Sequence, residues 1–293
     1  MSDTRKRRPT LQDIADLTGV TKMTVSRYLR DPSAVAEGTR ERIAAAVEEL
    51  GYIPNRAPDM LSNATSKAIG ILIPSLSNQV FSAVIHGIEA VTRPAGYQTL
   101  LAHYGYSPER EEEQVASLLS YNVDGLILSD TQHTERTRKM IATAGIPVVE
   151  TMDLPLSPID MVVGMDHRAA ARAMVTEMLR RGRRKVVYLG ARLDVRTQLR
   201  MEGYYQAMAD FGLNGQHLLT EQSSSFTLGG QLLEQAMARY PDLDGLFCTN
   251  DDVAVGALLQ CQARWIPVPQ QIAIAGCNAL DIGHAMTPKL ASI

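Results

Sequence analysis

Residues 10–29 read TLQDIADLTGVTKMTVSRYL, and this stretch decides the fold of the N-terminal part of the chain. Thr10 and Asp13 have the spacing of a capping box, in which a hydroxyl and a carboxylate close the first turn of a helix. Gly19 then interrupts the apolar pattern, because glycine adopts the positive φ of a tight turn at little cost. Thr21 can cap a second helix directly afterwards. The stretch therefore predicts two short helices joined by a turn.

Such a pair of helices is typical of the helix-turn-helix motif, whose second helix enters the major groove of DNA. In the second helix Val25 and Leu29 face inward, and a third helix over about 39–50 completes the predicted core. The alternative is a helical hairpin inside a larger domain. The outward side chains of the second helix can reach phosphates, base edges or a thymine methyl: Lys22, Met23, Thr24, Ser26 and Arg27.

The charge of the chain is unevenly distributed. The whole sequence of 293 residues has a net charge of −3 and an apolar content of 45%, typical of a globular protein of about two domains. Residues 1–30 nevertheless hold seven basic and three acidic side chains, whereas residues 63–293 hold nineteen basic and twenty-three acidic ones. A basic end on a mildly acidic body indicates contact with a polyanion. A solvated basic tail without a partner is the alternative.

Several classes of protein are not expected from this sequence. No apolar run approaches the ~18–20 residues of a membrane span, and the basic start is not followed by the apolar stretch of a secretory signal. Phosphate-binding loops, zinc-protease motifs and nucleophile elbows are absent. We therefore predict a cytoplasmic protein that is not an enzyme and has no cofactor or metal. The alternatives are a sugar-acid enzyme and a periplasmic sugar receptor that does not bind DNA.

The sequence after residue 67 alternates short β-branched runs with longer amphipathic stretches. This pattern predicts right-handed βαβ units, and so many strands predict two parallel sheets in two subdomains. The expected fold is thus α/β, with a helical helix-turn-helix headpiece in front of a two-subdomain core. The predicted strands are 69–73, 97–102, 125–129, 146–149, 185–190, 245–248 and 272–275.

Polar side chains follow many of these strands, where ligands of open parallel sheets bind. Carboxamides and carboxylates bind sugar hydroxyls, and arginine forks hold carboxylates, so we expect a small polyhydroxylated acid as the ligand. Arg192 also follows the fifth strand. In the alternative interpretation, Asn250 and Asp251 only cap a helix and the arginines lie on the surface. The predicted ligand-binding residues are Ser75, Asn78, Phe81, Arg196, Arg200, Asn250, Asp251 and Asn278.

Three segments of the N-terminal region, 10–15, 19–21 and 24–27, resemble the signature of the LacI family of bacterial repressors. Residues 51–55 resemble the segment that closes the third helix of that family, and Thr10 and Asn55 are therefore counted among the DNA-binding residues. The resemblance extends to the end of the chain. It implies a DNA-binding domain over 1–54, a hinge over 55–67, and an effector-binding and dimerisation core over 68–293. This core is expected to be periplasmic-binding-protein-like and shortened at its C-terminus.

The resemblance also implies roles for single residues. Leu61 would wedge into the minor groove at the centre of a palindromic operator bound by a homodimer, although Pro58 and Asp59 depart from the usual hinge pattern. A plain flexible tether is the alternative. Arg200, the TNDD segment over 249–252 and Asn278 match effector-contacting positions of the family. Further stretches, among them 77–81, 101–106 and 221–225, resemble family members that repress gluconate operons, which implies D-gluconate or a close sugar acid as the inducer.

Overall fold

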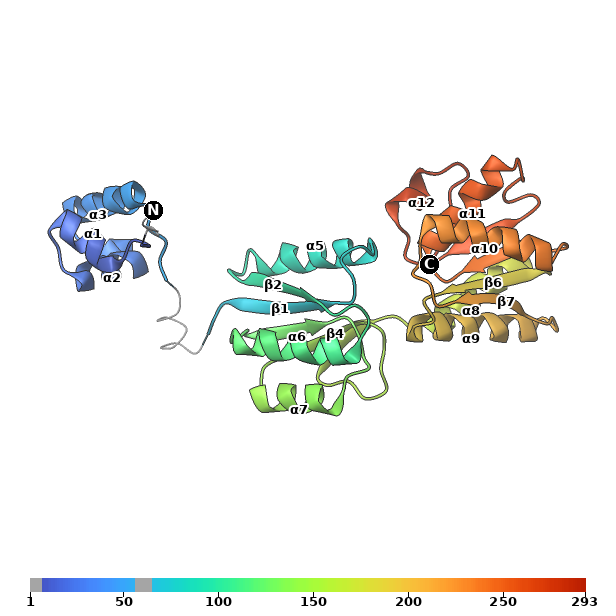
Figure 1. Cartoon of the computed structure of the whole chain (residues 1–293), viewed down its shortest axis with the longest axis horizontal. Coiled ribbons are helices and arrows are strands. Elements are labelled where there is room, and N and C mark those ends of the chain that lie inside the picture. The colour runs from blue at the N-terminus through green and yellow to red at the C-terminus, as the bar shows by residue number, and fades with distance from the viewer. Residues whose placement is uncertain (1–6, 56–64) are drawn as a thin grey trace, which may run out of the picture. The chain divides into compact units, whose positions relative to one another are not determined.

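The computed structural model describes residues 7–55 and 65–293, which fall into two compact units divided after Ser66 (Figure 1). The first unit, here called the headpiece, is helical. The second unit, here called the core, contains two parallel sheets with helices on both faces. This arrangement confirms the predicted fold class. The headpiece helices are α1 (Leu11–Thr18), α2 (Lys22–Arg30) and α3 (Glu37–Leu50), with a 3-10 turn over Pro32–Ala34.

The helix cap and the turn glycine predicted for the headpiece are present in the structure. The Thr10 side chain accepts from the Asp13 backbone, while the Asp13 carboxylate accepts from the Thr10 N–H at 2.7 Å, so both halves of the capping box are present. Gly19 ends α1 with φ +67°, the left-handed conformation that favours glycine. Ile14, Val25 and Ile43 are completely buried and join the three helices in one apolar core. α3 begins two residues earlier than predicted.

The first sheet of the core has the order β2-β1-β3-β4-β5, with all strands parallel. Side chains alternate across β1, because successive residues of a strand point to opposite faces. Leu72 packs with α6 and α7, whereas Ile71 packs with Phe81 of α5. The elements of this first lobe are β1 (Ala68–Ile73), α5 (Val80–Thr92), β2 (Gln98–His103), α6 (Pro108–Ser120), β3 (Gly125–Leu128), α7 (Glu135–Ala144), β4 (Val148–Met152) and β5 (Met161–Gly164).

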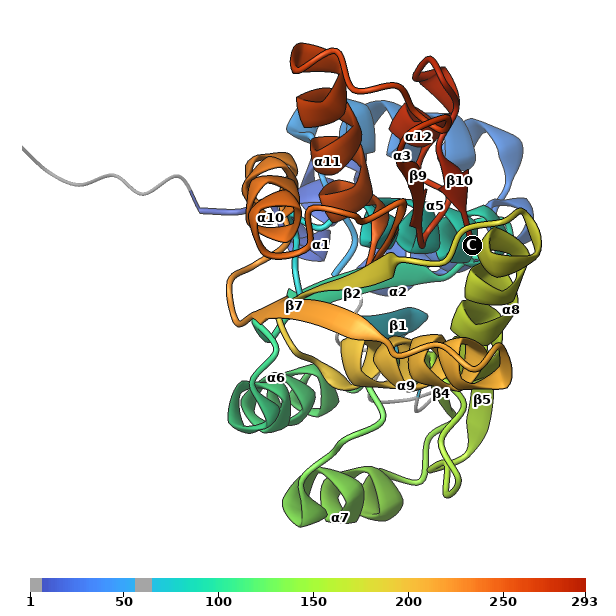
Figure 2. The same cartoon turned by 90° about the vertical axis from the view of Figure 1, so that its right-hand side faces the viewer.

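The second sheet has the order β10-β9-β8-β6-β7 and is also parallel. Leu189 and Leu246 face α10 and α11, whereas Tyr188 and Phe247 face α8 and α9 on the other side (Figure 2). The elements of this second lobe are α8 (His167–Arg180), β6 (Val186–Ala191), α9 (Val195–Asp210), β7 (Gln216–Thr220), α10 (Phe226–Arg239), β8 (Gly245–Cys248), α11 (Asp251–Ala263), β9 (Ala273–Gly276), α12 (Asp281–Ala285) and β10 (Ala291–Ser292).

Close packing of α8 against α9 depends on Gly203. A Cβ atom at this position would lie 2.1 Å from the carbonyl oxygen of Arg168, which is far too close for any side chain. Arg200 lies one turn before Gly203 on α9, and the same approach of the helices brings its guanidinium to His167 at the start of α8. The glycine therefore positions a functional side chain.

Three strands were not predicted from the sequence, and all three are edge strands. Met161–Gly164, Gln216–Thr220 and Ala291–Ser292 each lie at the end of a sheet, and much of their surface is exposed. Each is short or partly polar and lacks the longer apolar run of a central strand. Among the described residues, no helix combines the length and the apolar character needed to cross a lipid bilayer.

Candidate functional site

The second helix of the headpiece presents one face to solvent. Val25 anchors α2 in the core, while Lys22, Met23 and Arg27 are exposed, Met23 to 71%. Neither Lys22 nor Arg27 forms a side-chain hydrogen bond or ion pair with another residue of the described headpiece. Ser26 is partly exposed beside them. An exposed apolar side chain between two cations that have no protein partner is suited to a polyanion with apolar base edges.

Two of the other predicted DNA-binding residues, Thr10 and Thr24, also make hydrogen bonds within the headpiece. The Thr10 hydroxyl is engaged in the capping box, where it donates to the Asp13 carboxylate at 2.7 Å. The hydroxyls of Thr24 and Thr21 lie 3.0 Å apart at the start of α2, so Thr24 has a structural role as well. Asn55 is exposed. Leu61, with its neighbours Pro58 and Asp59, falls outside the described residues.

Three adjoining cavities are lined by residues of both lobes of the core. The amide cavity, about 30 Å³, is lined among others by Asn78, Asn250 and Asn278. The acidic cavity, about 240 Å³, contains Asp130 and Asp194 in its lining. The serine cavity, about 470 Å³, is lined by loop serines, among them Ser75 and 223–225. Tyr106 belongs to the lining of all three.

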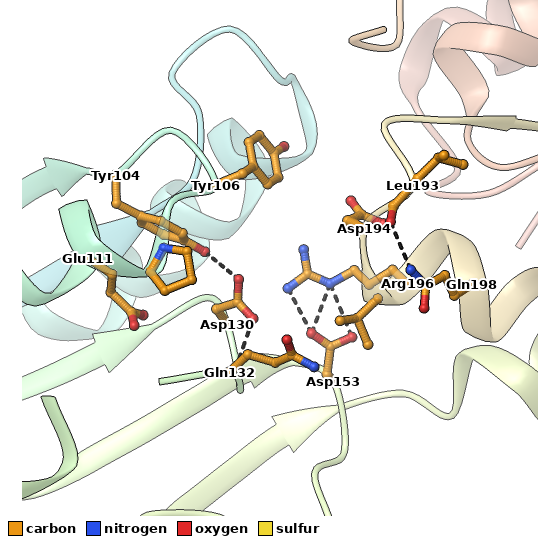
Figure 3. Close-up of a pocket in the computed structure, with 12 residues that line it drawn as sticks. Tyr104, Tyr106, Glu111, Asp130, Gln132, Asp153, Leu193, Asp194, Arg196 and Gln198 are labelled. Atoms are coloured by element: carbon orange, nitrogen blue, oxygen red, sulfur yellow. Dashed lines mark hydrogen bonds and ion pairs between the residues drawn. The ribbon is translucent and has the colours of Figure 1, made fainter. Parts of the chain in front are cut away.

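Arg196 crosses from the second lobe to the first. Its Nε donates to both carboxylate oxygens of Asp153, at 3.1 and 2.9 Å (Figure 3). Its Nη2 donates to the backbone carbonyl of Ser129 at 2.5 Å. Burial opposes ionisation of Asp153, but the hydrogen bond from His167 and the charge of Arg196 outweigh it and hold the pKa of Asp153 below its ordinary value. We expected the Arg196 guanidinium to hold a ligand carboxylate, but it is largely occupied by the carboxylate of Asp153.

Arg200 is buried and faces His167. Its Nε and Nη2 donate to Nδ1 of His167, at 3.3 and 3.2 Å, and its Nη1 donates to the Thr249 carbonyl. Because Nδ1 accepts these bonds, the ring proton is assigned to Nε2, which lies 3.0 Å from both the Met152 carbonyl and Asp153 Oδ1. A continuous chain of polar contacts therefore joins both arginines through one aspartate and one histidine.

The amide cavity brings six of the eight predicted ligand-binding residues together. Asn250 caps α11 by accepting from Val253 N–H, so its capping role is real, and its amide also donates to Ser224 at 2.8 Å. Asn278 has φ +113°, an unusual backbone conformation at the end of β9. The residues gathered at this cavity are Asn78, Phe81, Arg196, Arg200, Asn250 and Asn278.

Two predicted residues lie elsewhere. Ser75 lines the serine cavity, and its hydroxyl accepts from the backbone of Ser77 and Asn78. Asp251 is fully buried and lines none of the three cavities. Its two oxygens accept from the Leu280 N–H at 2.7 Å and the Ser292 hydroxyl at 2.6 Å. Asp251 thus ties the start of α11 to the C-terminal loop and strand.

Arg192 and Tyr106 line the cavities but were not among the predicted ligand-binding residues. The Arg192 guanidinium lies 4.1 Å from the centre of the Tyr106 ring, a cation–π contact, and both residues line the amide and serine cavities. Arg192 forms no ion pair within the described part of the core. The signal for Arg192 was its position after the fifth strand, which it shares with Arg196 and Arg200. Tyr106 lies in the stretch 101–106 that resembles gluconate-operon repressors, but it was not selected as a ligand-binding residue.

The fold and these two sites define a class of protein: a DNA-binding headpiece attached to a two-lobed core with a polar cleft for a small ligand. The bacterial regulatory proteins of the lacI family match residues 10–55, and the periplasmic binding proteins and sugar binding domain of the LacI family match residues 66–287. The chain belongs to the LacI family of bacterial transcriptional regulators. It is therefore a DNA-binding regulator, and the enzyme alternative is set aside.

Individual relatives agree with this assignment. The HTH-type transcriptional regulator GntR of Escherichia coli is 58% identical over 289 residues, covering 99% of this chain and 87% of that protein. The regulator IdnR of the same organism is 53% identical over 290 residues, with coverage of 99% and 87%. A solved structure of a LacI family regulator from Silicibacter pomeroyi superposes with a TM-score of 0.90 at 36% identity, covering 97% of this chain and 86% of that one.

Proposed function

We propose that this protein is a repressor of sugar-acid utilisation genes that leaves its operator when it binds gluconate or a close sugar acid. The observation that carries the proposal is the combination of an exposed basic helix face on the headpiece with a cleft that gathers three arginines and three carboxamides in the core. The similarity to GntR supports the same ligand class. Such a protein acts in the cytoplasm, where its DNA lies.

On the DNA side, a homodimer binds a palindromic operator, because a two-fold symmetric site requires a two-fold symmetric protein. Lys22, Met23 and Arg27 supply contacts to bases and phosphates. We retain 1–54 as the DNA-binding domain, 55–67 as a hinge in which Leu61 enters the minor groove, and 68–293 as the effector-binding and dimerisation core. Binding weakens steeply with salt, because phosphate contacts release counterions.

On the effector side, Arg192 receives the ligand carboxylate. Its guanidinium is held by an aromatic ring and not by a protein carboxylate, so it can accept an anion without breaking an existing ion pair. Arg200 adds positive charge beside the same cavity, and the carboxamides of Asn78, Asn250 and Asn278 bind hydroxyls. The sugar acid draws the two lobes together, and this closure disfavours the DNA-bound arrangement of the hinges.

A mobility-shift experiment tests this proposal. An operator is first selected from a random DNA library with the purified protein, and its retardation is then measured with and without D-gluconate. D-sorbitol, which carries the same kind of hydroxyl chain without the carboxylate, is the matched control. The proposal predicts a shifted band that gluconate abolishes and sorbitol does not. If no operator is selected, or if gluconate leaves the band unchanged, the proposal is wrong.

A further inference from the structure

The acidic cavity differs in chemistry from the amide cavity beside it. Tyr104, Glu111 and Asp130 lie on one side of it, and Asp194 and Arg196 lie on the other (Figure 3). Arg196 is its only cationic lining residue among those described, and this guanidinium is already paired with Asp153. The cavity therefore has an excess of negative charge.

Glu111 carries a carboxylate oxygen for which the described part of the core offers no hydrogen-bond donor. The side chain is 1% exposed, and its Oε2 is fixed by Nδ1 of His133 at 2.8 Å. The other nitrogen of His133 faces Glu150 at 3.3 Å, so the histidine is fully used. Oε1 of Glu111 is buried and has no hydrogen-bond partner among the described residues, while the side chain lines the acidic cavity. A buried acceptor without a donor is costly, which indicates that a ligand completes it.

The other groups of this cavity are mainly acceptors as well. Oδ2 of Asp130 accepts from the Tyr104 hydroxyl at 3.0 Å, which uses the proton of that hydroxyl and leaves its oxygen free to accept. Asp194 caps α9 and keeps lone pairs available. A group that donates hydrogen bonds fits this lining, whereas a carboxylate would bring acceptors and a like charge.

A six-carbon acid cannot fit within the amide cavity alone. Its volume of about 30 Å³ has room for roughly two water molecules. The acidic cavity shares Tyr106, Asp194 and Arg196 with it and offers about 240 Å³ more. Arg192 lines the amide cavity and not the acidic one, so the ligand carboxylate would lie in the amide cavity and the hydroxyl chain would extend into the acidic cavity.

We propose that the acidic cavity binds the terminal hydroxyls of the sugar acid, with Glu111 Oε1 and Asp130 as acceptors, and that it rejects ligands with a second carboxylate at that end. This inference rests on the proposed function and adds a direction of binding and a rule of specificity. The protein would discriminate an aldonate from the aldarate of the same length, although the two differ only at the last carbon.

Calorimetric titration of the full chain with three acids tests the inference. D-gluconate, D-glucarate and the four-carbon D-erythronate differ in the group that reaches the acidic cavity. We expect glucarate to bind at least about 30-fold more weakly than gluconate, because a like charge beside Asp130 is strongly unfavourable. Erythronate is expected to bind about tenfold more weakly, because it lacks the terminal hydroxyls.

Variants locate the effect. Glu111→Gln and Asp130→Asn should each reduce the preference for gluconate over glucarate by about tenfold, and neither should change erythronate binding. Glu113→Gln is the matched control, because this residue lies on the same helix α6 but is exposed. Since Glu111 is buried and Asp130 is partly exposed, Asp130→Asn keeps the test decisive should Glu111→Gln impair folding.

The outcomes separate this inference from the function on which it rests. If the wild-type protein binds gluconate and glucarate equally well, the acidic cavity is not the hydroxyl subsite, while the proposed function stands. If the preference exists but both variants retain it, it arises elsewhere and the inference fails. If no aldonate binds, the proposed function fails and the inference with it.

Discussion

The exposed face of α2 and the cleft of the core both carry arginine and polar side chains, but they use them differently. Lys22 and Arg27 extend from a small helical domain whose packing is complete without them. In the cleft, Arg196 is largely buried and donates to Asp153 and a backbone carbonyl, and Arg200 is buried and donates to His167 and a backbone carbonyl. A surface that meets a long polymer can leave its cations exposed, whereas a small-molecule site must hold buried cations in place before the ligand arrives.

The largest effect is expected from the double variant Lys22→Ala/Met23→Ala. Removal of one cation and one apolar contact should weaken operator binding by about 100-fold or more, since single base or phosphate contacts are worth roughly 1–3 kcal/mol. Gluconate affinity should remain unchanged. Lys139→Ala, an exposed residue of α7, is the charge-matched control. Fluorescence anisotropy with a labelled operator measures the effect, and loss of both activities together would contradict the division between headpiece and core.

Within the cleft, Arg192 and Arg200 should separate binding from stability. Arg192→Ala should lower gluconate affinity by about 30-fold with little change in melting temperature, because this guanidinium stacks on the Tyr106 ring and forms no ion pair within the described part of the core. Arg200→Ala should remove the gluconate response and also destabilise the core by about 1–3 kcal/mol, because the Thr249 carbonyl and His167 lose a buried donor. Calorimetry and chemical denaturation test this pair. Equal losses of stability in both variants would show that Arg192 is structural.

Gly203→Ala tests whether helix packing positions the cleft. The new methyl group would meet the Arg168 carbonyl, so we expect a loss of about 1–3 kcal/mol of core stability and weaker gluconate binding through a displaced Arg200. Gly87→Ala on α5 is the control, because a Cβ there would meet no described residue within 4 Å. Unchanged unfolding of Gly203→Ala in urea would mean that α8 and α9 tolerate a wider separation.

The smallest effect concerns pH. Because the pKa of Asp153 is lowered from 3.8 in the folded protein, its contribution to stability is present above that value and is lost as the pH falls through the lower folded pKa. Asp153→Asn should therefore be less stable at pH 7 and show a shallower loss of stability in acid. Melting curves from pH 7 downwards measure both effects. Parallel curves for the two proteins would show that other carboxylates dominate.

The sequence predicts the headpiece better than the cleft for a physical reason. The capping box, Gly19 and the burial of Val25 are local signals, and side chains that point away from a helix follow from its periodicity. The contact of Arg196 with Asp153 joins residues 43 positions apart on different lobes, so no local pattern reveals it. For the same reason Asp251 resembled a ligand-binding group, although its partners are Leu280 and Ser292.

The ligand-binding residues of the cleft were nevertheless largely predictable, because parallel strands bring their carboxyl ends to one edge of a sheet. Six of the predicted residues line one cavity on this basis. Tyr106 and Glu111 could not be selected, because no residue pattern distinguishes Tyr106 from its neighbours after the second strand, and Glu111 is a buried carboxylate on a helix whose other acids are partly or fully exposed. Burial of a charged side chain depends on tertiary contacts that a single sequence does not display.

The central claim is that gluconate binding in the cleft and operator binding by the headpiece weaken each other. Calorimetric titration of D-gluconate into the free protein and into its operator complex tests this claim. Linkage requires that gluconate weaken operator binding by the same factor by which the operator weakens gluconate binding, and we expect that factor to be roughly 10–100. Equal gluconate affinity for the free protein and the operator complex would contradict the account.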